Sequence, residues 1–173
     1  RDLNTYVKAN YQITERFNAF ADLQYRKIDY VVAGKENNLN EVSVNAQFNF
    51  FNLKAGLTFA LTDESQLYAS FAVANREPVR HDFLDFEGSD PEPESLQNVE
   101  MGYRGSGKQH AFQAKYYLMN YRNQLVLTGE VNDVGAFVRT NAGKSYRMGI
   151  ELQGMIRLTD KFLWNANLTL SRN

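Results

Sequence analysis

The densest group of side chains that could do chemistry lies between residues 76 and 85. Arginine, histidine and carboxylates alternate there over a short stretch: Arg76, Glu77, Arg80, His81, Asp82 and Asp85. The arginines could bind an anionic chelate, and His81 with nearby carboxylates could coordinate a metal ion. A single histidine among scattered aspartates has no known ligand spacing, so we expect ligand contacts here and no metal site. The competing interpretation is a solvated loop whose charges only fix its conformation.

Catalysis has little support in the sequence. A barrel enzyme would need aspartate and histidine pairs that converge at the ends of strands, and His81 and His110 are the only histidines. His110 lies beside a predicted tight turn, at the opposite end from His81. Gly105 and Gly107 mark a hairpin turn rather than a phosphate-binding loop. We therefore expect no enzyme, no catalytic residue and no cofactor.

Three further charged residues lie within segments that alternate between apolar and polar positions. From Ser145 to Ile156, Tyr146, Met148, Ile150 and Leu152 share one face, and Ser145, Arg147, Glu151 and Gln153 share the other. Side chains of a β-strand alternate between faces, so Arg147 and Glu151 point away from the apolar side. Glu100 lies between the apolar residues Val99 and Met101, so it also points away from the apolar side. We expect Glu100, Arg147 and Glu151 to face a wet lumen, where a structural charge network is the leading interpretation.

The elements that position these residues are about eight alternating segments. They cover roughly residues 3–13, 17–30, 42–61, 67–76, 98–104, 112–127, 145–158 and 162–170. Turns near residues 14, 63, 106 and 160 are short, and the loops near 35, 85 and 132 (the last about 128–137) are long. Membrane barrels combine short turns at one end with long loops at the other. The pattern predicts an all-β fold without a helix, an antiparallel up-and-down transmembrane β-barrel segment of about eight strands.

One segment changes its phase halfway. Val42 to Phe50 places apolar residues at even positions, whereas Leu53 to Leu61 places them at odd positions. A β-bulge shifts the phase of a strand by one residue. We therefore expect a bulge near Phe50-Phe51-Asn52.

Composition narrows the class of protein. The formal net charge of the 173 residues is -1, without a basic stripe, which argues against a nucleic-acid partner. There is no apolar run of about 18 residues, so a transmembrane helix is excluded, while barrel strands are compatible with the mean hydropathy of -0.49. There are no cysteines, hence no disulfides and no cysteine zinc site.

Four phrases of the sequence resemble the TonB-dependent outer-membrane receptors, most closely those of Bacteroidetes-type bacteria. They are Phe50-Phe51-Asn52-Leu53-Lys54-Ala55-Gly56-Leu57; Tyr68-Ala69-Ser70-Phe71 with Asn75-Arg76-Glu77-Pro78; Pro93-Glu94-Ser95-Leu96 with Glu100-Met101-Gly102-Tyr103; and Asn141-Ala142-Gly143-Lys144-Ser145 with Gly149-Ile150-Glu151-Leu152. They stand in the order and spacing of that family and cover most of the chain. Leu53 departs from the family pattern, which usually has proline there.

The resemblance implies a 22-strand barrel of the bacterial outer membrane with an N-terminal plug. Such a receptor imports an iron chelate, haem, cobalamin or a similar small extracellular ligand, with the plug and TonB as protein partners and lipid or detergent around the wall. Residues 1–173 show no plug, no TonB box and no terminal strand that ends in an aromatic residue. We therefore expect a partial barrel domain, from the C-terminal half, that does not transport by itself.

Two other interpretations remain open. The chain could be a self-contained small outer-membrane barrel with a structural or adhesive role. Eight strands leave a narrow interior, however, and the many inward charges would have to pair with one another there. It could also be a soluble barrel that binds apolar ligands, which would leave its apolar face exposed to water. An open membrane segment is the expectation we carry forward.

Overall fold

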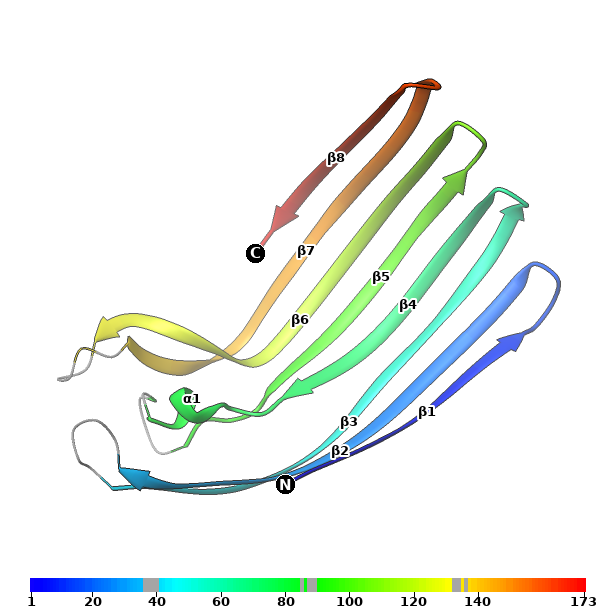
Figure 1. Ribbon diagram of the computed structural model, residues 1–173. Helices are drawn as coiled ribbons and strands as arrows, with labels where there is room; N and C mark the ends of the chain where they lie inside the picture. The colour runs from blue at the N-terminus through cyan, green and yellow to red at the C-terminus, as the bar shows by residue number, and fades with distance from the viewer. Residues whose placement is uncertain (36–40, 85, 87–89, 132–134, 136) are drawn as a thin grey trace.

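The computed structural model describes residues 1–35, 41–84, 86, 90–131, 135 and 137–173. They form eight strands and one short helix (Figure 1). The elements are β1 (Asp2–Gln12), β2 (Phe17–Lys35), β3 (Glu41–Thr62), β4 (Ser65–Arg76), α1 (Arg80–Leu84), β5 (Glu94–Ser106), β6 (His110–Val131), β7 (Phe137–Thr159) and β8 (Phe162–Arg172). The all-β prediction is confirmed, and the expectation of no helix is corrected by α1.

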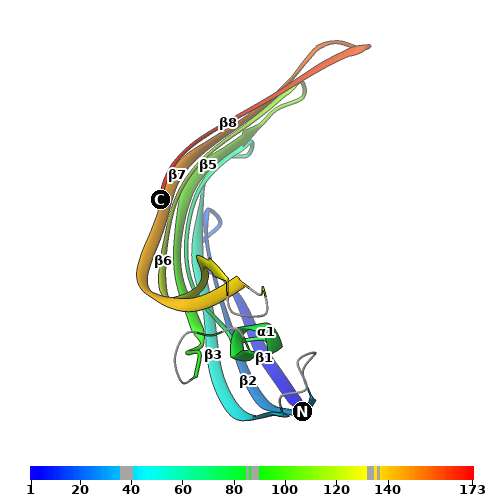
Figure 2. The same cartoon turned by 90° about the vertical axis from the view of Figure 1, so that its left-hand side faces the viewer.

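The strands form one antiparallel sheet in chain order, β1 to β8. Each strand pairs with its neighbours in the sequence, which confirms the up-and-down arrangement. Within the described residues β1 and β8 do not pair with each other, so the sheet is open. Figure 2 shows it as a curved wall with α1 on the concave side.

Four tight turns lie at one end of the wall, where the sequence predicted them. They join β1 to β2, β3 to β4, β5 to β6 and β7 to β8 (Figure 1). In the first, Thr14 Oγ1 accepts a hydrogen bond of 3.1 Å from the backbone N–H of Phe17. At the other end, the predicted loop near residue 35 falls mostly on residues 36–40, outside the described part. The predicted loop from Thr128 to Phe137 was too long, because β6 and β7 stay paired up to Val131 and Phe137.

The register gives the sheet two chemically different faces. The inner face is the side that carries Arg26, Lys54, Glu100, Lys115 and Glu151. It is the concave side, because Arg26 binds the segment that contains α1. Lys54 lies opposite Asp22, and Lys115 lies opposite Glu151. The opposite side, the outer face, carries apolar residues over the half of the sheet nearest the tight turns.

We call that outer-face region the apolar belt. Its residues are Val7, Ala9, Tyr11, Ala19, Ala21, Leu23, Leu53, Ala55, Leu57, Leu67, Ala69, Phe71, Val99, Met101, Tyr103, Phe112, Ala114, Tyr116, Leu118, Met148, Ile150, Leu152, Trp164, Ala166, Leu168 and Leu170. Leu57 is 44% exposed and Ile150 is 47% exposed, although apolar side chains favour burial. An apolar surface of this extent is typical of a surface that meets lipid or another protein.

The predicted β-bulge near Phe50-Phe51-Asn52 was wrong. The pairing of β2 with β3 runs without a shift from Phe17↔Phe59 to Lys35↔Glu41. Even-numbered residues of β3 therefore stay on the inner face throughout. What changes at this level is the polarity of the faces, since the inner face turns apolar at Phe48 and Phe50 while the outer face turns polar at Asn49 and Gln47.

The region beyond this change, away from the tight turns, has a small core on the inner side. Ile28 and Phe50 are only 5% and 6% exposed. The rings of Phe48 and Phe50 stack at 5.8 Å, and Tyr30 stacks at 5.7 Å on Phe83 of α1. We call this part of β2 and β3, residues 26–35 and 41–50, the outer arm. Its apolar residues serve protein packing on the inner side, whereas the apolar belt lies on the outer side.

Glycines allow aromatic rings to lie flat on the inner face of the belt region. A Cβ on Gly102 would come within 2.7 Å of the hydroxyl of Tyr68 and 2.4 Å of the carbonyl oxygen of Ala114. Gly56 faces Phe20, and Gly149 faces Tyr117, in the same way. The ring in each pair also meets a cation: Lys54 over Phe20, Arg104 over Tyr68, and Lys115 over Tyr117. These contacts keep the wall thin where the inner face is charged.

Candidate functional site

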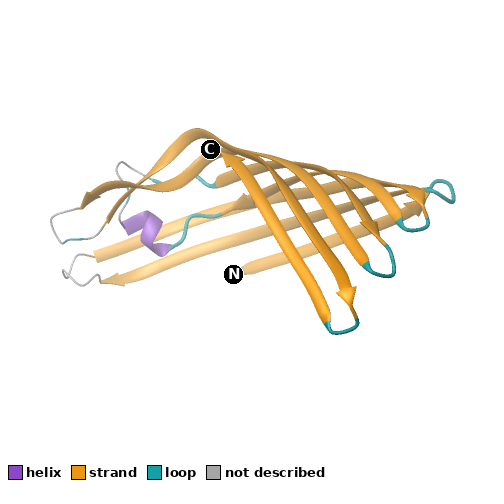
Figure 3. Ribbon diagram, turned by 90° about the horizontal axis from the view of Figure 1, so that it is seen from above, coloured by secondary structure: helices purple, strands orange, loops and turns teal. Residues whose placement is uncertain are grey.

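The predicted ligand-contacting residues belong to a connection that folds back over the inner face. We call its described residues, 77–84, 86 and 90–93, the strap. Figure 3 shows α1, part of the strap, lying in the trough of the curled sheet. The strap begins at the end of β4 and returns to β5, although Arg76 and Glu94 are direct cross-strand partners. A short turn could connect these two residues, so the strap is longer than the connection requires.

Glu77 fixes the start of the strap to β2. Both carboxylate oxygens of Glu77 accept hydrogen bonds of 3.0 Å from the guanidinium of Arg26. Arg26 also donates to Asp2 at 2.7 Å, at the level of the outer arm and beyond the apolar belt. The guanidinium holds the pKa of the Asp2 carboxyl below its usual value, because it donates hydrogen bonds to the charged form. Arg26 thus joins β1, β2 and the strap.

Asp82 fixes the middle of the strap to β7. Its side chain is fully buried, and Oδ1 accepts a hydrogen bond of 3.2 Å from Arg139 Nη1. The other oxygen accepts the backbone N–H of Val79 at 2.8 Å and so closes the first turn of α1. A buried carboxylate needs such partners, since an unpaired charge away from water costs several kcal/mol. Asp82 is therefore an anchor of the strap.

Glu92 fixes the end of the strap to β6 and β7. Its backbone N–H donates to Asn141 Oδ1 at 2.8 Å, and Asn141 Nδ2 donates back to its carbonyl oxygen at 3.0 Å. The carboxylate accepts a hydrogen bond from Asn123. Asn123 has a φ of 54°, a conformation that asparagine tolerates better than most residues. Near this point the β6–β7 hairpin bends towards α1 (Figure 2).

The remaining predicted residues divide into separate positions. Arg76 pairs with Glu94 at 2.9 Å along the neighbouring strands. Arg80 and His81 are exposed on α1. Asp85 lies outside the described residues. The structure thus brings Glu77 and Asp82 into contact with the sheet, and Arg80 and His81 lie on the exposed side of α1. That these residues bind a ligand stays a prediction.

Glu100, Arg147 and Glu151 lie on the inner face, as the alternation predicted. Glu151 makes an ion pair of 2.8 Å with Lys115. Glu100 accepts a hydrogen bond of 3.0 Å from Asn98, and the guanidinium of Arg147 lies 5.5 Å from the ring centre of Tyr121. These contacts are separate pairs along the inner face of the wall. That these residues form one charge network and border a lumen stays a prediction.

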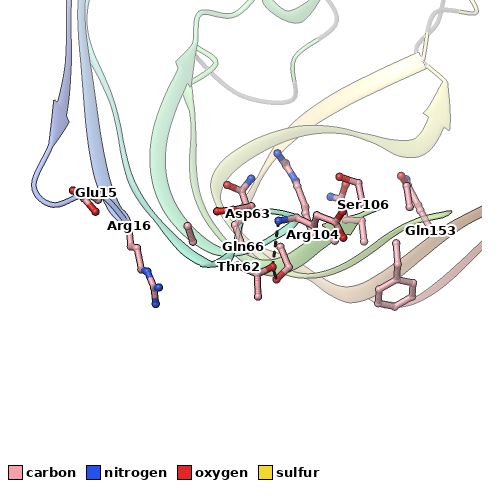
Figure 4. Close-up of a pocket in the computed structure, with 15 residues that line it drawn as sticks. Glu15, Arg16, Thr62, Asp63, Gln66, Arg104, Ser106 and Gln153 are labelled. Carbon is pink, nitrogen blue, oxygen red and sulfur yellow. Dashed lines mark hydrogen bonds between the residues drawn. The ribbon is translucent and has the colours of Figure 1, made fainter. Parts of the chain in front are cut away.

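A polar hollow of about 700 Å³ lies at the tight-turn end of the inner face (Figure 4). Side chains from several strands line it, among them Gln66, Arg104, Gln113 and Gln153. Arg104 lies 4.5 Å from the ring centre of Tyr68, and Thr62 and Ser65 share a hydrogen bond of 2.7 Å. The described residues contain no group of three histidine, cysteine or carboxylate side chains that could hold a metal ion.

The sequence missed the residues that receive the strap. Arg26, Asn123, Arg139 and Asn141 come from three strands that are distant in the chain, and no spacing in the sequence links them to residues 77–93. Asn141 stands in one of the phrases that resemble the receptor family, which was the only available signal. The fold alone brings these residues together.

Solved structures with the same fold cover almost the whole chain. The copper transporter OprC matches 99% of this chain and 29% of its own, with 16% identity and a TM-score of 0.80. The ferric yersiniabactin uptake receptor FyuA from Yersinia pestis matches 99% and 26%, with 18% identity and a TM-score of 0.75. The alcaligin outer membrane receptor FauA from Bordetella pertussis matches 98% and 29%, with 14% identity and a TM-score of 0.70. No curated protein sequence matches this chain.

An open, up-and-down sheet with an apolar belt outside and charges inside defines a segment of a β-barrel wall. The family model "TonB dependent receptor-like, beta-barrel" matches residues 1–173, and the chain belongs to this family. It spans about a quarter to a third of the length of the structures it matches. No helix in the described part is long and apolar enough to cross a membrane.

Proposed function

We propose that this chain is part of the wall of an outer-membrane barrel that imports a small nutrient in a TonB-dependent manner. The observation that carries the proposal is the pair of faces, one apolar over a continuous belt and one charged, in a sheet whose edge strands β1 and β8 are unpaired. Lipid would cover the belt, and further strands would continue the sheet at both edges. The open edges give no support to a self-contained small barrel.

The cargo we propose is a small anionic metal chelate, such as an iron chelate, or a nutrient of similar size such as haem or cobalamin. The proteins with the same fold carry the names copper transporter, ferric yersiniabactin uptake receptor and alcaligin receptor. Arg80 and His81 are our candidates for ligand contacts, because they are exposed on α1 on the concave side. A plug domain and TonB would be the protein partners of this barrel in the complete transporter.

Uptake by the complete receptor tests this proposal. Cells that make the receptor are compared with receptor-free cells for accumulation of radiolabelled iron as citrate, catecholate and hydroxamate chelates and as haem, and of labelled cobalamin, with and without an uncoupler of the proton gradient. We expect accumulation of one of these probes that the uncoupler abolishes. Equal accumulation of every probe in both strains would contradict the proposed import.

Arg80 can be tested in the same assay. The Arg80→Gln variant should raise the half-saturating concentration of an anionic probe by about tenfold, since a hydrogen bond to a charged group is lost. Arg16, an exposed arginine in a tight turn at the opposite end, provides the matched control variant Arg16→Gln. An unchanged half-saturating concentration for Arg80→Gln would remove Arg80 from the ligand site and leave the import itself untouched.

A further inference from the structure

The strap contacts strands that are far apart in the sheet. Its first anchor is Arg26 on β2, its second is Arg139 on β7, and its third joins Asn123 on β6 and Asn141 on β7. Three strands, β3, β4 and β5, lie between β2 and β6 in the sheet order. The strap is therefore a chord across the concave side of a curved wall, in addition to a connection between β4 and β5.

A chord that is fixed at both ends limits the curvature of the wall. A single sheet can flex by small changes of twist at each strand pair, and these changes add up over many strands. If β2 and β7 are tied through one segment, any flattening of the wall must stretch the strap or break an anchor. The strap also covers the apolar inner side of the outer arm, where Phe83 stacks on Tyr30.

The anchors have the chemistry of a fixed latch rather than of a solvated loop. Asp82 is 1% exposed and Glu77 is 20% exposed, so water screens both ion pairs poorly. Pro78 between them is also fully buried. Ile28, which is 5% exposed, lies on the inner face between Arg26 and Tyr30, and both of these residues contact the strap. Because its two neighbours on this face contact the strap, we expect the strap to cover Ile28 as well.

We propose that the strap is a cross-brace that holds β2 and β7 at a fixed separation and closes over the inner side of the outer arm, with Glu77 and Asp82 as its latches. Breaking either latch frees the strap as a unit, widens the range of distances between β2 and β7 and uncovers Ile28. This role concerns the wall itself and does not depend on which ligand the receptor carries.

Thiol accessibility in the complete receptor tests the latches. These 173 residues contain no cysteine, so Ile28→Cys introduces the single thiol of this segment, and any cysteine elsewhere in the receptor is first replaced by serine. We expect slow reaction with a maleimide, and a rate at least about tenfold higher when Glu77→Gln or Asp82→Asn is added, because each removes charged hydrogen bonds. The matched control Lys115→Gln breaks the inner-face ion pair of 2.8 Å between Lys115 and Glu151, neither of which belongs to the strap, and its rate should stay within about twofold. Equal rates in all variants would overturn the proposal.

A second reporter at the far end tests whether the strap acts as one unit. Leu125, 9% exposed, lies on β6 two residues beyond Asn123, which binds Glu92. Leu125→Cys should also react faster when Glu77→Gln breaks the anchor on β2. If only the thiol nearest the broken latch responds, the strap is not a brace. Hydrogen exchange of the α1 amides Asp82 and Phe83, measured without any cysteine, gives the same answer should a cysteine variant fail to fold.

Distance measurements test the brace directly. Lys27 on β2 and Lys144 on β7 are exposed on the outer face, so spin labels attached to cysteines there leave the inner contacts intact. In the complete receptor in lipid nanodiscs we expect a narrow distribution of the distance between the two labels. With Asp82→Asn the distribution should be at least about twice as broad, because the strand pairs between β2 and β7 can then change their twist without restraint by the strap. A distribution of unchanged width would show that the strap does not restrain the wall.

Discussion

The two ends of β3 have opposite polarity on the same backbone ladder. In the belt region Leu57 faces outward and Thr58 faces inward, whereas in the outer arm Asn45 faces outward and Phe50 faces inward. The strand does not change its register between them, so the difference lies in the surroundings. Near the tight turns the outer face requires apolar residues, and beyond Phe50 the inner face requires them because the strap packs there. The apolar side of the strand therefore indicates which side is covered: the outer face in the belt region and the inner face in the outer arm.

The largest effect should come from the small core of the outer arm. Phe50→Ala removes a ring that is 6% exposed and stacked on Phe48, and should cost about 3–5 kcal/mol of local stability. The neighbouring Phe51, 63% exposed on the outer face, is the matched control, and Phe51→Ala should cost about 1 kcal/mol or less. Hydrogen exchange of the outer arm measures both. An equal loss of local stability in Phe50→Ala and Phe51→Ala would contradict the conclusion that the inner side of the outer arm is the packed side.

The second-largest effect should come from a positive charge placed on the outer face, which should destabilise the belt region more than the outer arm. Leu57→Arg places a cation in the apolar belt and should cost about 2–4 kcal/mol if lipid covers it. Asn45→Arg places the same charge on the same face of β3 in the outer arm, where we expect a change within about 0.5 kcal/mol. Urea unfolding of the complete receptor in lipid vesicles measures both values. Similar tolerance at the two positions would argue against lipid contact at Leu57.

The flat aromatic rings of the inner face should give an intermediate effect. Gly102→Ala forces a methyl group against Tyr68 and the carbonyl oxygen of Ala114 and should cost about 1–3 kcal/mol. A Cβ on Gly154 meets no atom within 4 Å, so Gly154→Ala should change stability by less than about 1 kcal/mol. The same unfolding assay compares the two variants. A cost at Gly154 equal to that at Gly102 would mean that the tight contact is unimportant.

The smallest difference should separate two ion pairs of the inner face. Lys115 and Glu151 lie 2.8 Å apart with side chains 22% and 29% exposed, whereas Lys8 and Asp22 lie 3.9 Å apart with 55% and 33% exposed. Lys115→Gln should lower the free energy of unfolding by about 1 kcal/mol and Lys8→Gln by less than about 0.5 kcal/mol. High salt should remove most of the smaller effect. A larger loss at Lys8 would reverse the expected order.

The sequence predicts the belt region well and the outer region poorly, for physical reasons. Strands in the belt region alternate strictly because one side is apolar and the other is wet. The positions of the tight turns, the strand ends beside them and the face that carries Glu100, Arg147 and Glu151 therefore followed from period two. The change at Phe50 could not be interpreted correctly from the pattern alone. A bulge and a change of surroundings give the same shift of apolar residues, and only the pairing register distinguishes them.

The strap shows a different limit of the sequence. Its charges suggested ligand binding, but the partners that decide their role, Arg26 and Arg139, lie 51 and 57 positions away along the chain. An ion pair between distant segments leaves no local pattern, and a five-residue helix such as α1 is too short for a reliable hydrophobic period. The role of Arg80 and His81 as ligand contacts stays a prediction.

A cysteine scan along β3 tests the central claim most directly. Single cysteines at each position from 42 to 60 of the complete receptor, in intact outer membranes, are reacted with a membrane-impermeant maleimide. We predict that odd positions from 53 to 59 are protected by lipid, that odd positions from 43 to 49 react freely, and that even positions from 44 to 50 are protected by protein packing. If the odd positions, which lie on the outer face, were protected from the maleimide along the whole strand, the change of polarity at Phe50 would be contradicted.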